Sequence, residues 1–361
     1  MTQYKNLKIN PKAIQALKDF QMPAEYGFGR VISPVMIICD YYRGEWGTPR
    51  MIPYGPIQMH PTCKVLHYAQ EIFEGLKAYR VEGKGPFLFR PEENWKRFNK
   101  SAERMAMPEM PRELFMSAVE GITAYSASYI PSLSGESLYI RPFMFTSEET
   151  LGIKPSDEFR FMVIASPSGS YFSADSLPVY IERDQIRACP GGVGAAKTGG
   201  NYAAGIQSAI RSQQHGCLQT IWLDAIERKY IEEMSGMNFM AVINDCLVTP
   251  KITDTILDGI TRRSLLKLAE HLGITVKEES MEMSKLLNAI QSGDCTEAFA
   301  CGTAATITPI KSFVEEDGTV YKIPYDNGPV AQRLREGLLA LQEGRTEDPF
   351  NWVHLVEPAS Y

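Results

Sequence analysis

A lysine flanked by glycines is the residue of this sequence whose type and setting most clearly suggest chemistry. The stretch GGVGAAKTGGNY spans residues 191–202, and Lys197 lies near its centre. Glycines carry no side chain, so another molecule can approach the backbone of such a loop closely. A lysine amine presented in this way is a candidate Schiff-base nucleophile, provided that its surroundings favour the unprotonated form.

Two other interpretations of this lysine stay open from the residues alone. The loop is close to the phosphate-binding pattern G-x-x-x-x-G-K-[ST], but Ala196 stands where that pattern requires glycine. The pair Gly199–Gly200 would also weaken the helical turn that a P-loop lysine opens. We expect the helix to start after these glycines, with Asn201 as its N-cap. The third interpretation is an ordinary solvated lysine.

The elements that must position this loop alternate between strand and helix patterns. In the first half of the chain we expect strands at 31–39, 50–57, 74–81, 85–89, 137–145 and 159–166, and helices at 91–105 and 112–125. In the second half we expect strands at 178–182, 217–224, 229–233 and 239–243, and helices at 202–215 and 261–271. The irregular alternation predicts an α+β fold.

The segment 167–178 is rich in serine, proline and glycine, which is the composition of a linker. A chain of 361 residues has the length of about two domains. We therefore expect an N-terminal domain over 1–170, a linker over 171–180 and a C-terminal domain with the lysine over 181–361.

Composition excludes several classes of protein. The 37 basic and 43 acidic residues give a net charge of −6, and without a basic block a nucleic-acid partner is not expected. No apolar run approaches the roughly 20 residues of a membrane-spanning helix. The seven cysteines are scattered and form no C-x-x-C pair, so neither a disulfide framework nor a metal site is indicated. We expect a cytoplasmic globular protein.

Several separated motifs together resemble one family. KTGGNY, followed some thirty residues later by EEMSGMN, is similar to the branched-chain amino acid aminotransferases, which use pyridoxal 5′-phosphate. The other motifs of the resemblance, which runs from about residue 28 to 353, are YAQEIFEGLKAYR, RPEENWKRF, SLYIRP, LDGITRRSLL and GTAATITPI. The resemblance implies a two-domain, fold type IV (D-amino acid aminotransferase-like) homodimer, with a smaller N-terminal domain and the cofactor in the interdomain cleft.

The implied reaction is reversible transfer of the amino group of L-leucine, L-isoleucine or L-valine to 2-oxoglutarate, through pyridoxamine phosphate. In it Lys197 would bind the cofactor covalently and then serve as acid and base. Glu233 would accept a hydrogen bond from the pyridine nitrogen, and we expect its neighbour Glu232 to be the solvated one of the pair. The cofactor-binding residues implied by the resemblance are Arg97, Lys197, Tyr202, Glu233, Leu257, Ile260, Thr261 and Thr303.

The resemblance also implies a substrate site. Tyr139 would meet the substrate carboxylate together with the amides of Thr303 and Ala304, and Arg141, two residues along the same expected strand, would orient the tyrosine. Tyr171 in the linker would border the pocket. Tyr68 and Phe73 would line the wall for a branched side chain, and we expect the Tyr68 hydroxyl to bind the distal carboxylate of glutamate.

Other functions stay open beside this one. A D-amino acid aminotransferase, or a lyase acting on a chorismate-derived amine, would keep the fold and change the reaction. A P-loop nucleotide-binding module would change both, and a purified protein that is yellow rather than colourless would argue against it. The order of preference among leucine, isoleucine and valine does not follow from the sequence.

Overall fold

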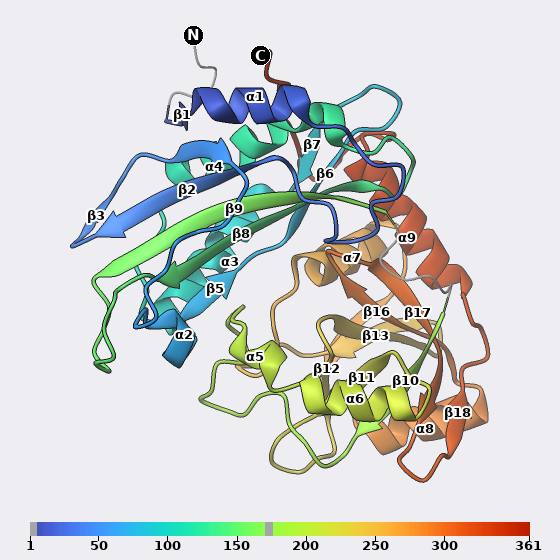
Figure 1. Ribbon diagram of the computed structural model, residues 1–361. Helices are drawn as coiled ribbons and strands as arrows, with labels where there is room; N and C mark the ends of the chain where they lie inside the picture. Colours follow the sequence, from blue (N-terminus) through green and yellow to red (C-terminus); the bar gives the residue numbers. More distant parts are fainter. Residues whose placement is uncertain (1–5, 170–175) are drawn as a thin grey trace. The chain divides into compact units, whose positions relative to one another are not determined.

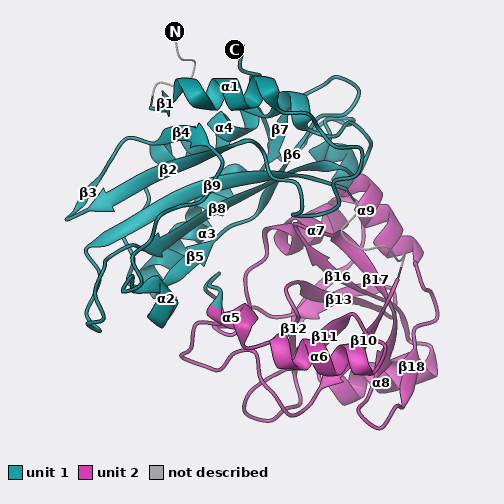
Figure 2. Cartoon of the chain, in the orientation of Figure 1, with its two compact units in different colours: residues 1–171, 196–199, 339–361 teal, residues 172–195, 200–338 magenta. Residues whose placement is uncertain are grey.

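Two mixed β-sheets, each with its own helices, make up the part of the chain that the structure describes. The computed structural model describes residues 6–169 and 176–361. Unit 1 comprises Met1–Tyr171, Ala196–Gly199 and Leu339–Tyr361, and unit 2 comprises Phe172–Ala195 and Gly200–Leu338 (Figure 2). This mixture of sheets and helices confirms the predicted α+β class.

The sheet of unit 1 is built around two long antiparallel strands (Figure 1). β8 (Ser137–Thr146) and β9 (Glu158–Ser168) pair along the whole of β8. Over the described residues the strand order is β1-β4-β2-β9-β8-β6-β7-β19, with β3 beside β2 and β5 beside β8. The remaining strands are β1 (Lys8–Ile9), β2 (Val35–Tyr42), β3 (Glu45–Trp46), β4 (Arg50–Pro53), β5 (Glu71–Phe73), β6 (Leu76–Tyr79), β7 (Phe87–Phe89) and β19 (Val353–Leu355).

Two amphipathic helices supply much of the core of unit 1. α3 (Pro91–Arg104) and α4 (Arg112–Tyr125) form within one residue of the predicted bounds. Proline fits the first helical position because its ring already fixes φ near the helical value. The ring of Phe98 on α3 lies 5.6 Å from that of Phe115 on α4 and 5.6 Å from that of Phe161 on β9. The shorter helices of the unit are α1 (Pro11–Asp19), α2 (Val65–Tyr68) and the 3-10 turn η1 (Ala127–Tyr129).

The sheet of unit 2 has the order β12-β11-β10-β17-β16-β13-β14-β15 over the described residues, with β18 beside β17. Its strands are β10 (Leu177–Glu182), β11 (Gln219–Leu223), β12 (Ile231–Met234), β13 (Asn238–Ile243), β14 (Cys246–Pro250), β15 (Val276–Glu279), β16 (Cys295–Gly302), β17 (Thr306–Val314) and β18 (Val320–Lys322). Its helices are α5 (Gly200–Ala203), α6 (Ile206–Gln214), α7 (Ile260–His271), α8 (Met283–Ser292) and α9 (Pro329–Gln342), which passes into unit 1 at Leu339.

Parallel strand pairs explain where the helices of unit 2 occur. β10 runs parallel to β11, and α5 and α6 form the connection between them. β14 runs parallel to β15, and α7 forms that connection. Parallel neighbours need a crossover rather than a tight turn, and each of these helices lies within such a crossover connection.

The prediction of a single helix over 202–215 is wrong. The structure has two helices, α5 and α6, separated by a turn at Ala204 and Gly205. Asn201 does not act as an N-cap, because it lies within α5 and its side-chain amide donates to the carbonyl of Val193 at 2.9 Å. A glycine at position 205 and a tertiary hydrogen bond outweigh the local helix pattern here.

The two units differ from the predicted domains in two places. Leu339–Tyr361 belongs to unit 1, where β19 pairs antiparallel with β7. Ala196–Gly199 also belongs to unit 1, and the backbone of Lys197 contacts β5 there. Both assignments depend on contacts between segments far apart in the sequence, which a change of composition does not signal. The predicted linker 171–180 falls partly outside the described residues, and β10 occupies its last part.

Within residues 6–169 and 176–361, no helix combines the length and the apolar character needed to cross a bilayer. The same residues hold no cluster of three or more histidine, cysteine or acidic side chains suited to a metal ion. All seven cysteines are free thiols, and every one except Cys189 is buried. Buried thiols of this kind pack as small apolar side chains, as Cys39 does in unit 1 and Cys295 in unit 2.

A buried glutamate holds the start of α9. The carboxylate of Glu297 on β16 accepts hydrogen bonds from the backbone nitrogens of Val330 at 2.9 Å and Ala331 at 2.8 Å. Amides in the first turn of a helix have no partner within the helix. A Cβ at Gly328 would lie 2.0 Å from Cδ of Glu297, so glycine at this position makes room for the carboxylate.

We expect Glu297→Ala to lower the free energy of unfolding by roughly 2–6 kcal/mol, because two amides lose a buried acceptor at about 1–3 kcal/mol each. The measurement is urea denaturation, monitored by tryptophan fluorescence. Glu279→Ala, on an exposed position of β15, is the control and should stay within about 0.5 kcal/mol of the parent. Equal losses in the two variants would contradict the role given to Glu297.

Candidate active site

The segment that carries Lys197 is attached to β5 and α3 of unit 1. The backbone nitrogen of Lys197 donates to Ser101 Oγ at 3.0 Å, and its carbonyl accepts from the nitrogen of Phe73 at 3.0 Å. The chain on either side of Ala196–Gly199 belongs to unit 2. The irregular loop that the sequence predicts is therefore present, and both polar backbone groups of the lysine are fixed to unit 1.

The ring of Phe73 faces two cations. Lys197 Nζ lies 4.7 Å from the ring centroid, and the guanidinium carbon of Arg141 lies 4.6 Å from it. A cation within about 6 Å of an aromatic face is attracted by the ring quadrupole. The structure thus brings Phe73, Lys197 and Arg141 together in unit 1, and Phe73 helps to place both basic groups.

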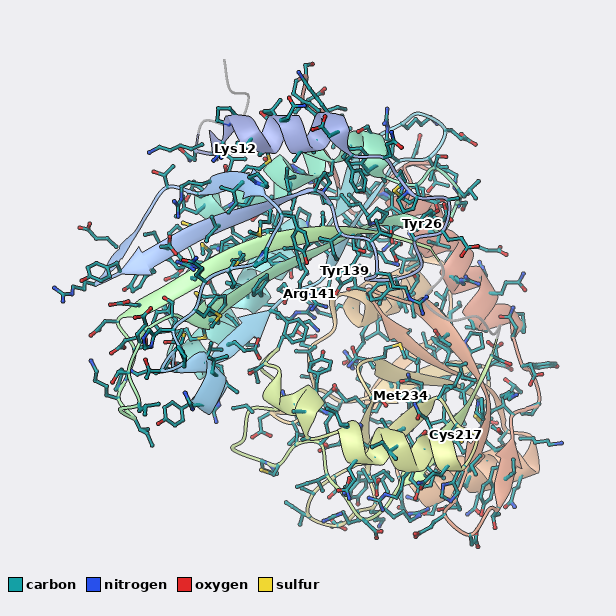
Figure 3. All side chains as sticks on the ribbon, viewed as in Figure 1. Lys12, Tyr26, Tyr139, Arg141, Cys217 and Met234 are labelled. Atoms are coloured by element: carbon teal, nitrogen blue, oxygen red, sulfur yellow. The ribbon has the colours of Figure 1, made fainter. Side chains whose placement is uncertain are left out.

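Tyr139 and Arg141 lie on the same face of β8, as their spacing predicts (Figure 3). Arg141 Nη2 donates to the hydroxyl of Tyr139 at 3.0 Å, which confirms the predicted contact. A Cβ at Gly75 would lie 2.1 Å from that hydroxyl, so only glycine leaves it room. Because arginine is the donor in this bond, the phenolic proton of Tyr139 can be given to an acceptor such as a carboxylate.

Arg97 is buried in an ion pair rather than solvated. It donates through Nε to Glu74 Oε1 at 2.7 Å and through Nη2 to Glu74 Oε2 at 2.9 Å, and Asn94 donates to Oε2 at 2.7 Å. Burial alone would raise the pKa of Glu74, but the Arg97 guanidinium outweighs it and holds that pKa below its ordinary value, with a smaller contribution from Lys197. The bidentate pair fixes the direction of the guanidinium.

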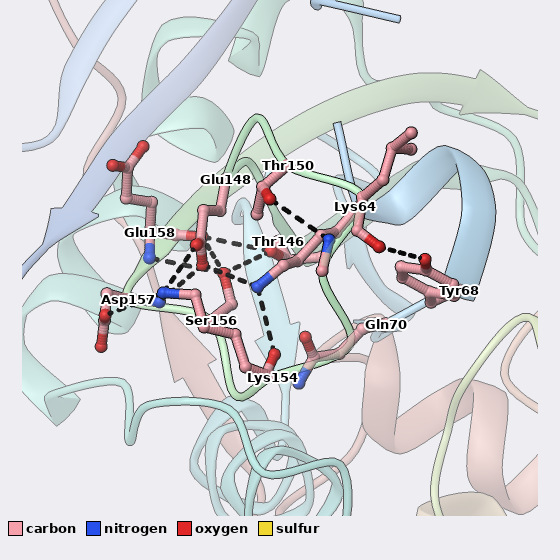
Figure 4. A network of polar contacts seen from close by, with 12 residues as sticks. Lys64, Tyr68, Gln70, Thr146, Glu148, Thr150, Lys154, Ser156, Asp157 and Glu158 are labelled. Carbon is pink, nitrogen blue, oxygen red and sulfur yellow. Dashed lines mark hydrogen bonds and ion pairs between the residues drawn. The ribbon is translucent and has the colours of Figure 1, made fainter. Parts of the chain in front are cut away.

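Tyr68, at the end of α2, is engaged through its hydroxyl (Figure 4). The hydroxyl donates to the carbonyl of Leu151 at 2.6 Å, and the side chain is 42% exposed. A carboxylate requires a donor, and the Tyr68 proton is already given to the backbone. In this conformation the Tyr68 proton is given to the backbone, and the binding of a distal carboxylate by this hydroxyl stays a prediction.

The loop that contacts Tyr68 is itself held by a buried lysine (Figure 4). Lys64, which is 2% exposed, donates to Glu148 Oε2 at 2.9 Å and to the carbonyl of Lys154 at 3.1 Å. Lys154 Nζ lies 3.1 Å from Glu148 Oε1. Burial opposes the charge of Glu148, but the hydrogen bonds from Lys64 and Lys154 outweigh it and lower the pKa of Glu148 to about 2.

In unit 2, both members of the glutamate pair on β12 are buried, so the prediction that Glu232 is solvated is wrong. Glu233 Oε2 accepts from the nitrogen of Leu257 at 2.9 Å, and Arg187 Nε lies 3.1 Å from Glu233 Oε1. Glu232 Oε1 accepts from the hydroxyl of Thr255 at 2.6 Å. Burial raises the pKa of Glu232. A short strand covered on both faces leaves neither residue in water.

Tyr202 lies on α5 and is 39% exposed. A Cβ at Gly236 would lie 3.4 Å from Cε1 of its ring, so the ring stands close to the turn that follows β12. Glu233 is on that strand, one residue from its end. The structure therefore places Tyr202 and Glu233 on neighbouring segments of unit 2.

The remaining predicted cofactor residues gather at one end of the unit 2 sheet. α7 begins at Ile260 and Thr261, as predicted, after Gly259 as N-cap. Asn238 at the start of β13 donates to the carbonyl of Leu257 at 2.9 Å, and a Cβ at Gly259 would lie 1.9 Å from Asn238 Oδ1.

The register of the sheet adds the last two residues to this end. Asn238 pairs with Cys301, next to the end of β16. Thr303 and Ala304 form the turn between β16 and β17, which therefore lies at the end of the sheet where β13 begins. Backbone amides at a helix N-terminus and in a tight turn bind anions.

Tyr171 lies outside the described residues, so its predicted place at the substrate pocket stays a prediction. Sequence reasoning missed three groups that hold predicted site residues: Glu71, Glu74 and Arg187. Glu71 and Glu74 fall inside the quoted motif YAQEIFEGLKAYR, but nothing in their spacing shows which residue they contact. Arg187 has no local signal at all.

These residues fit an anionic, nitrogen-containing aromatic cofactor. Unit 2 offers helix and turn amides for a phosphate, and a buried carboxylate at Glu233 that suits a protonated ring nitrogen. Arg187 Nε, although near Glu233, makes no hydrogen bond within the described residues. Unit 1 offers a lysine amine beside an aromatic ring and a buried arginine.

Residues 71–313 match the family described as amino-transferase class IV. A probable branched-chain-amino-acid aminotransferase of Streptomyces coelicolor is 43% identical over 335 residues, covering 92% of each chain. The chain belongs to the branched-chain aminotransferases within class IV. The Escherichia coli branched-chain amino acid aminotransferase structure is 30% identical, with a TM-score of 0.73 over 88% of this chain and 99% of that one.

A second solved branched-chain amino acid aminotransferase is also similar, with 27% identity and a TM-score of 0.72 over 93% of this chain and 100% of that one. That protein was solved in complex with N-(5′-phosphopyridoxyl)-L-glutamate. These similarities confirm the predicted branched-chain aminotransferase family and the fold type IV architecture.

The buried ion pair beside Tyr68 predicts a loss of stability in acid. A carboxylate whose pKa is lowered on folding stabilises the protein above its ordinary pKa of 4.5, and this contribution disappears as the pH falls towards about 2. We expect Lys64→Met to cost about 3 kcal/mol at pH 7, because it leaves Glu148 without its buried partner. The difference from the parent should shrink between pH 4.5 and pH 2.

Urea denaturation at pH 7 and pH 3 measures this difference. Lys96→Met is the control, since Lys96 is 62% exposed and pairs with Glu93 on the surface of α3. A Lys64→Met difference that is the same at both pH values would rule out the proposed link to Glu148.

Proposed function

We propose that this chain catalyses reversible transfer of the amino group of L-leucine, L-isoleucine or L-valine to 2-oxoglutarate, with pyridoxal 5′-phosphate as cofactor. The observation that carries the proposal is the identity of 43% over 92% of the chain to a probable branched-chain-amino-acid aminotransferase. The setting of Lys197 supports it, because the amine lies beside an aromatic ring on a loop whose backbone is fixed.

Lys197 is the acid and base of the reaction. Its Nζ accepts the proton from the α-carbon of the amino acid, and a fixed backbone keeps the amine within reach of that carbon. The bound pyridoxal phosphate supplies the electron sink that makes this proton acidic. Glu233 is buried beside Arg187, and its carboxylate would accept a hydrogen bond from a protonated ring nitrogen.

The phosphate is held by backbone amides rather than by a cluster of exposed charges. Ile260 and Thr261 give the first amides of α7, and Thr303 adds its hydroxyl. Arg97 supplies positive charge, which Glu74 partly balances. Tyr202 would donate to the phenolic oxygen of the cofactor.

The substrate carboxylate is bound by Tyr139 and by the amides of Thr303 and Ala304. Arg141 orients Tyr139 and leaves its proton for the substrate. Phe73 and the ring of Tyr68 line the place of the branched side chain, where apolar contact contributes about 0.8 kcal/mol per buried CH₂ group. Tyr171, which lies outside the described residues, would border the same pocket.

A cytoplasmic homodimer is part of the proposal. Unit 1 exposes the large side chains of Tyr54, Leu66 and Tyr68, each by about 40% or more. Apolar surface of this kind is a common feature of subunit interfaces. Seven free thiols agree with a reducing compartment.

Replacement of the lysine tests the reaction directly. Lys197→Ala should abolish the visible absorbance of the lysine-bound cofactor and reduce transamination by at least roughly 10⁴-fold, as removal of a catalytic nucleophile and base does in other enzymes. Lys285→Ala, 79% exposed on α8, should retain both. Transamination by Lys197→Ala near the parent rate would overturn the proposal, and a panel of L- and D-amino acids with 2-oxoglutarate distinguishes a D-amino acid aminotransferase.

The two glutamates of β12 separate the electronic role from a structural one. Glu233→Gln cannot hold a ring proton as a carboxylate does, so we expect kcat to fall roughly 10²-fold or more. Glu232→Gln should change kcat little, because the pKa of Glu232 is already raised by burial and its hydrogen bond from Thr255 can be kept by the amide oxygen. Steady-state kinetics measure both variants, and equal effects would mean that the roles are assigned to the wrong residue.

A further inference from the structure

Glu71, the first residue of β5, binds the lysine segment with its side chain. Its Oε1 accepts a hydrogen bond from the backbone nitrogen of Gly199 and lies 3.4 Å from the hydroxyl of Thr198, which donates to it. All three residues belong to unit 1. The two residues that follow Lys197 are therefore both held by one carboxylate.

β5 contacts the segment at two points. The backbone nitrogen of Phe73 donates to the carbonyl of Lys197, and the side chain of Glu71 accepts from Gly199. Thr198, between the two points, is 1% exposed. A segment held on both sides of a buried residue has little freedom to rotate, so the direction in which the Lys197 side chain leaves the backbone is set by β5.

Gly199 is shaped to this contact. A Cβ at position 199 would lie 2.5 Å from Glu71 Oε1 and 3.3 Å from its Cδ, closer than real Cβ contacts allow. Gly200 differs, because a Cβ there would meet nothing within 4 Å. The first glycine of the pair thus makes room for the carboxylate in this position, whereas the second does not touch it.

We propose that Glu71 is a positioning residue that fixes the conformation of the Lys197–Gly199 segment and thereby the place of the lysine amine. The inference rests on the proposed function for the role of Lys197, but the contact itself can be tested without that function. Burial raises the pKa of Glu71, while the hydrogen bonds from Gly199 and Thr198 and the charge of Arg141 oppose the rise. The segment thus supplies two of the donors that oppose this rise.

Amide hydrogen exchange of the full-length apo protein tests the contact. In Glu71→Ala the amide of Gly199 loses its acceptor, so the peptide covering 196–200 should exchange at least about tenfold faster. Glu71→Gln should give a smaller increase, since its amide oxygen can still accept one bond. Gly200→Ala is the matched control and should leave the rate unchanged. An unchanged rate in Glu71→Ala would overturn the inference.

A double substitution tests the steric half of the inference. Gly199→Ala should also speed exchange of the peptide, since its Cβ pushes the carboxylate away, and it should weaken cofactor binding by about tenfold or more. In Glu71→Ala/Gly199→Ala the clash is absent, so the second substitution should add little to the first. Additive effects would mean that the two residues act independently, which contradicts the proposal. If Glu71→Ala does not fold, Glu71→Ser combined with Gly199→Ala answers the same question, because a serine side chain is too short to meet the new Cβ.

The cofactor-loaded enzyme gives a readout that a merely structural role would not move. A displaced amine should shift the pH at which the visible absorbance of the lysine-bound cofactor changes, and it should lower kcat more than it raises KM. Gly200→Ala should shift neither. Failure of Lys197→Ala to affect the absorbance would reject the proposed function, whereas unaltered exchange in Glu71→Ala would reject only the role of Glu71.

Discussion

The short hydrogen-bonded contact between β5 and the segment 196–199 decides where the reactive lysine lies. The hydrogen bonds of this contact do not involve the side chain of Lys197. The carbonyl of Lys197 accepts a hydrogen bond from the nitrogen of Phe73, and its nitrogen donates to Ser101 Oγ. The next two residues, Thr198 and Gly199, both donate to the carboxylate of Glu71. A flexible four-carbon side chain can place its amine reproducibly only if its Cα is fixed, and here the fixing is done by main-chain groups. Gly199 allows this approach, because a Cβ there would lie 2.5 Å from Glu71 Oε1.

Buried charge is the second constraint, and each unit meets it by pairing. Arg97 is balanced by Glu74 in unit 1, and Glu233 is accompanied by Arg187 in unit 2. An isolated buried charge is costly, whereas a paired and hydrogen-bonded one can be retained. The pairing also fixes direction: a guanidinium held by two oxygens cannot turn, so Arg97 can serve a ligand without losing freedom when it binds. The buried charge of Arg97 is therefore already oriented before any ligand binds.

Local pattern predicts much of this fold, and tertiary contacts explain where it fails. α3, α4 and α7 follow from proline or glycine at their starts and apolar stripes along them, and each forms within a residue or two of its predicted bounds. The family motifs lead to the proposed site residues, and the contact between Tyr139 and Arg141 follows from strand spacing alone. Period-2 alternation could not show that Glu232 is buried, because burial depends on what covers each face of β12. It also could not show that Lys197 joins unit 1, since that depends on hydrogen bonds to residues distant in the sequence.

The same limit applies to the end of the unit 2 sheet that we propose binds the cofactor phosphate, where no cluster of basic side chains gives a signal in the sequence. The start of α7, the turn at Thr303 and Ala304, and Leu257 converge because β13 pairs with β16 in one register and Asn238 links β13 to the loop before α7. Their donors are backbone amides, which every residue except proline possesses, so composition cannot reveal them. The convergence does leave one trace in the sequence, which is the glycine at position 259. A Cβ there would lie 1.9 Å from Asn238 Oδ1. A chain with a net charge of −6 can therefore bind an anion at this end, because strand register and glycine placement, rather than net charge, determine the local field.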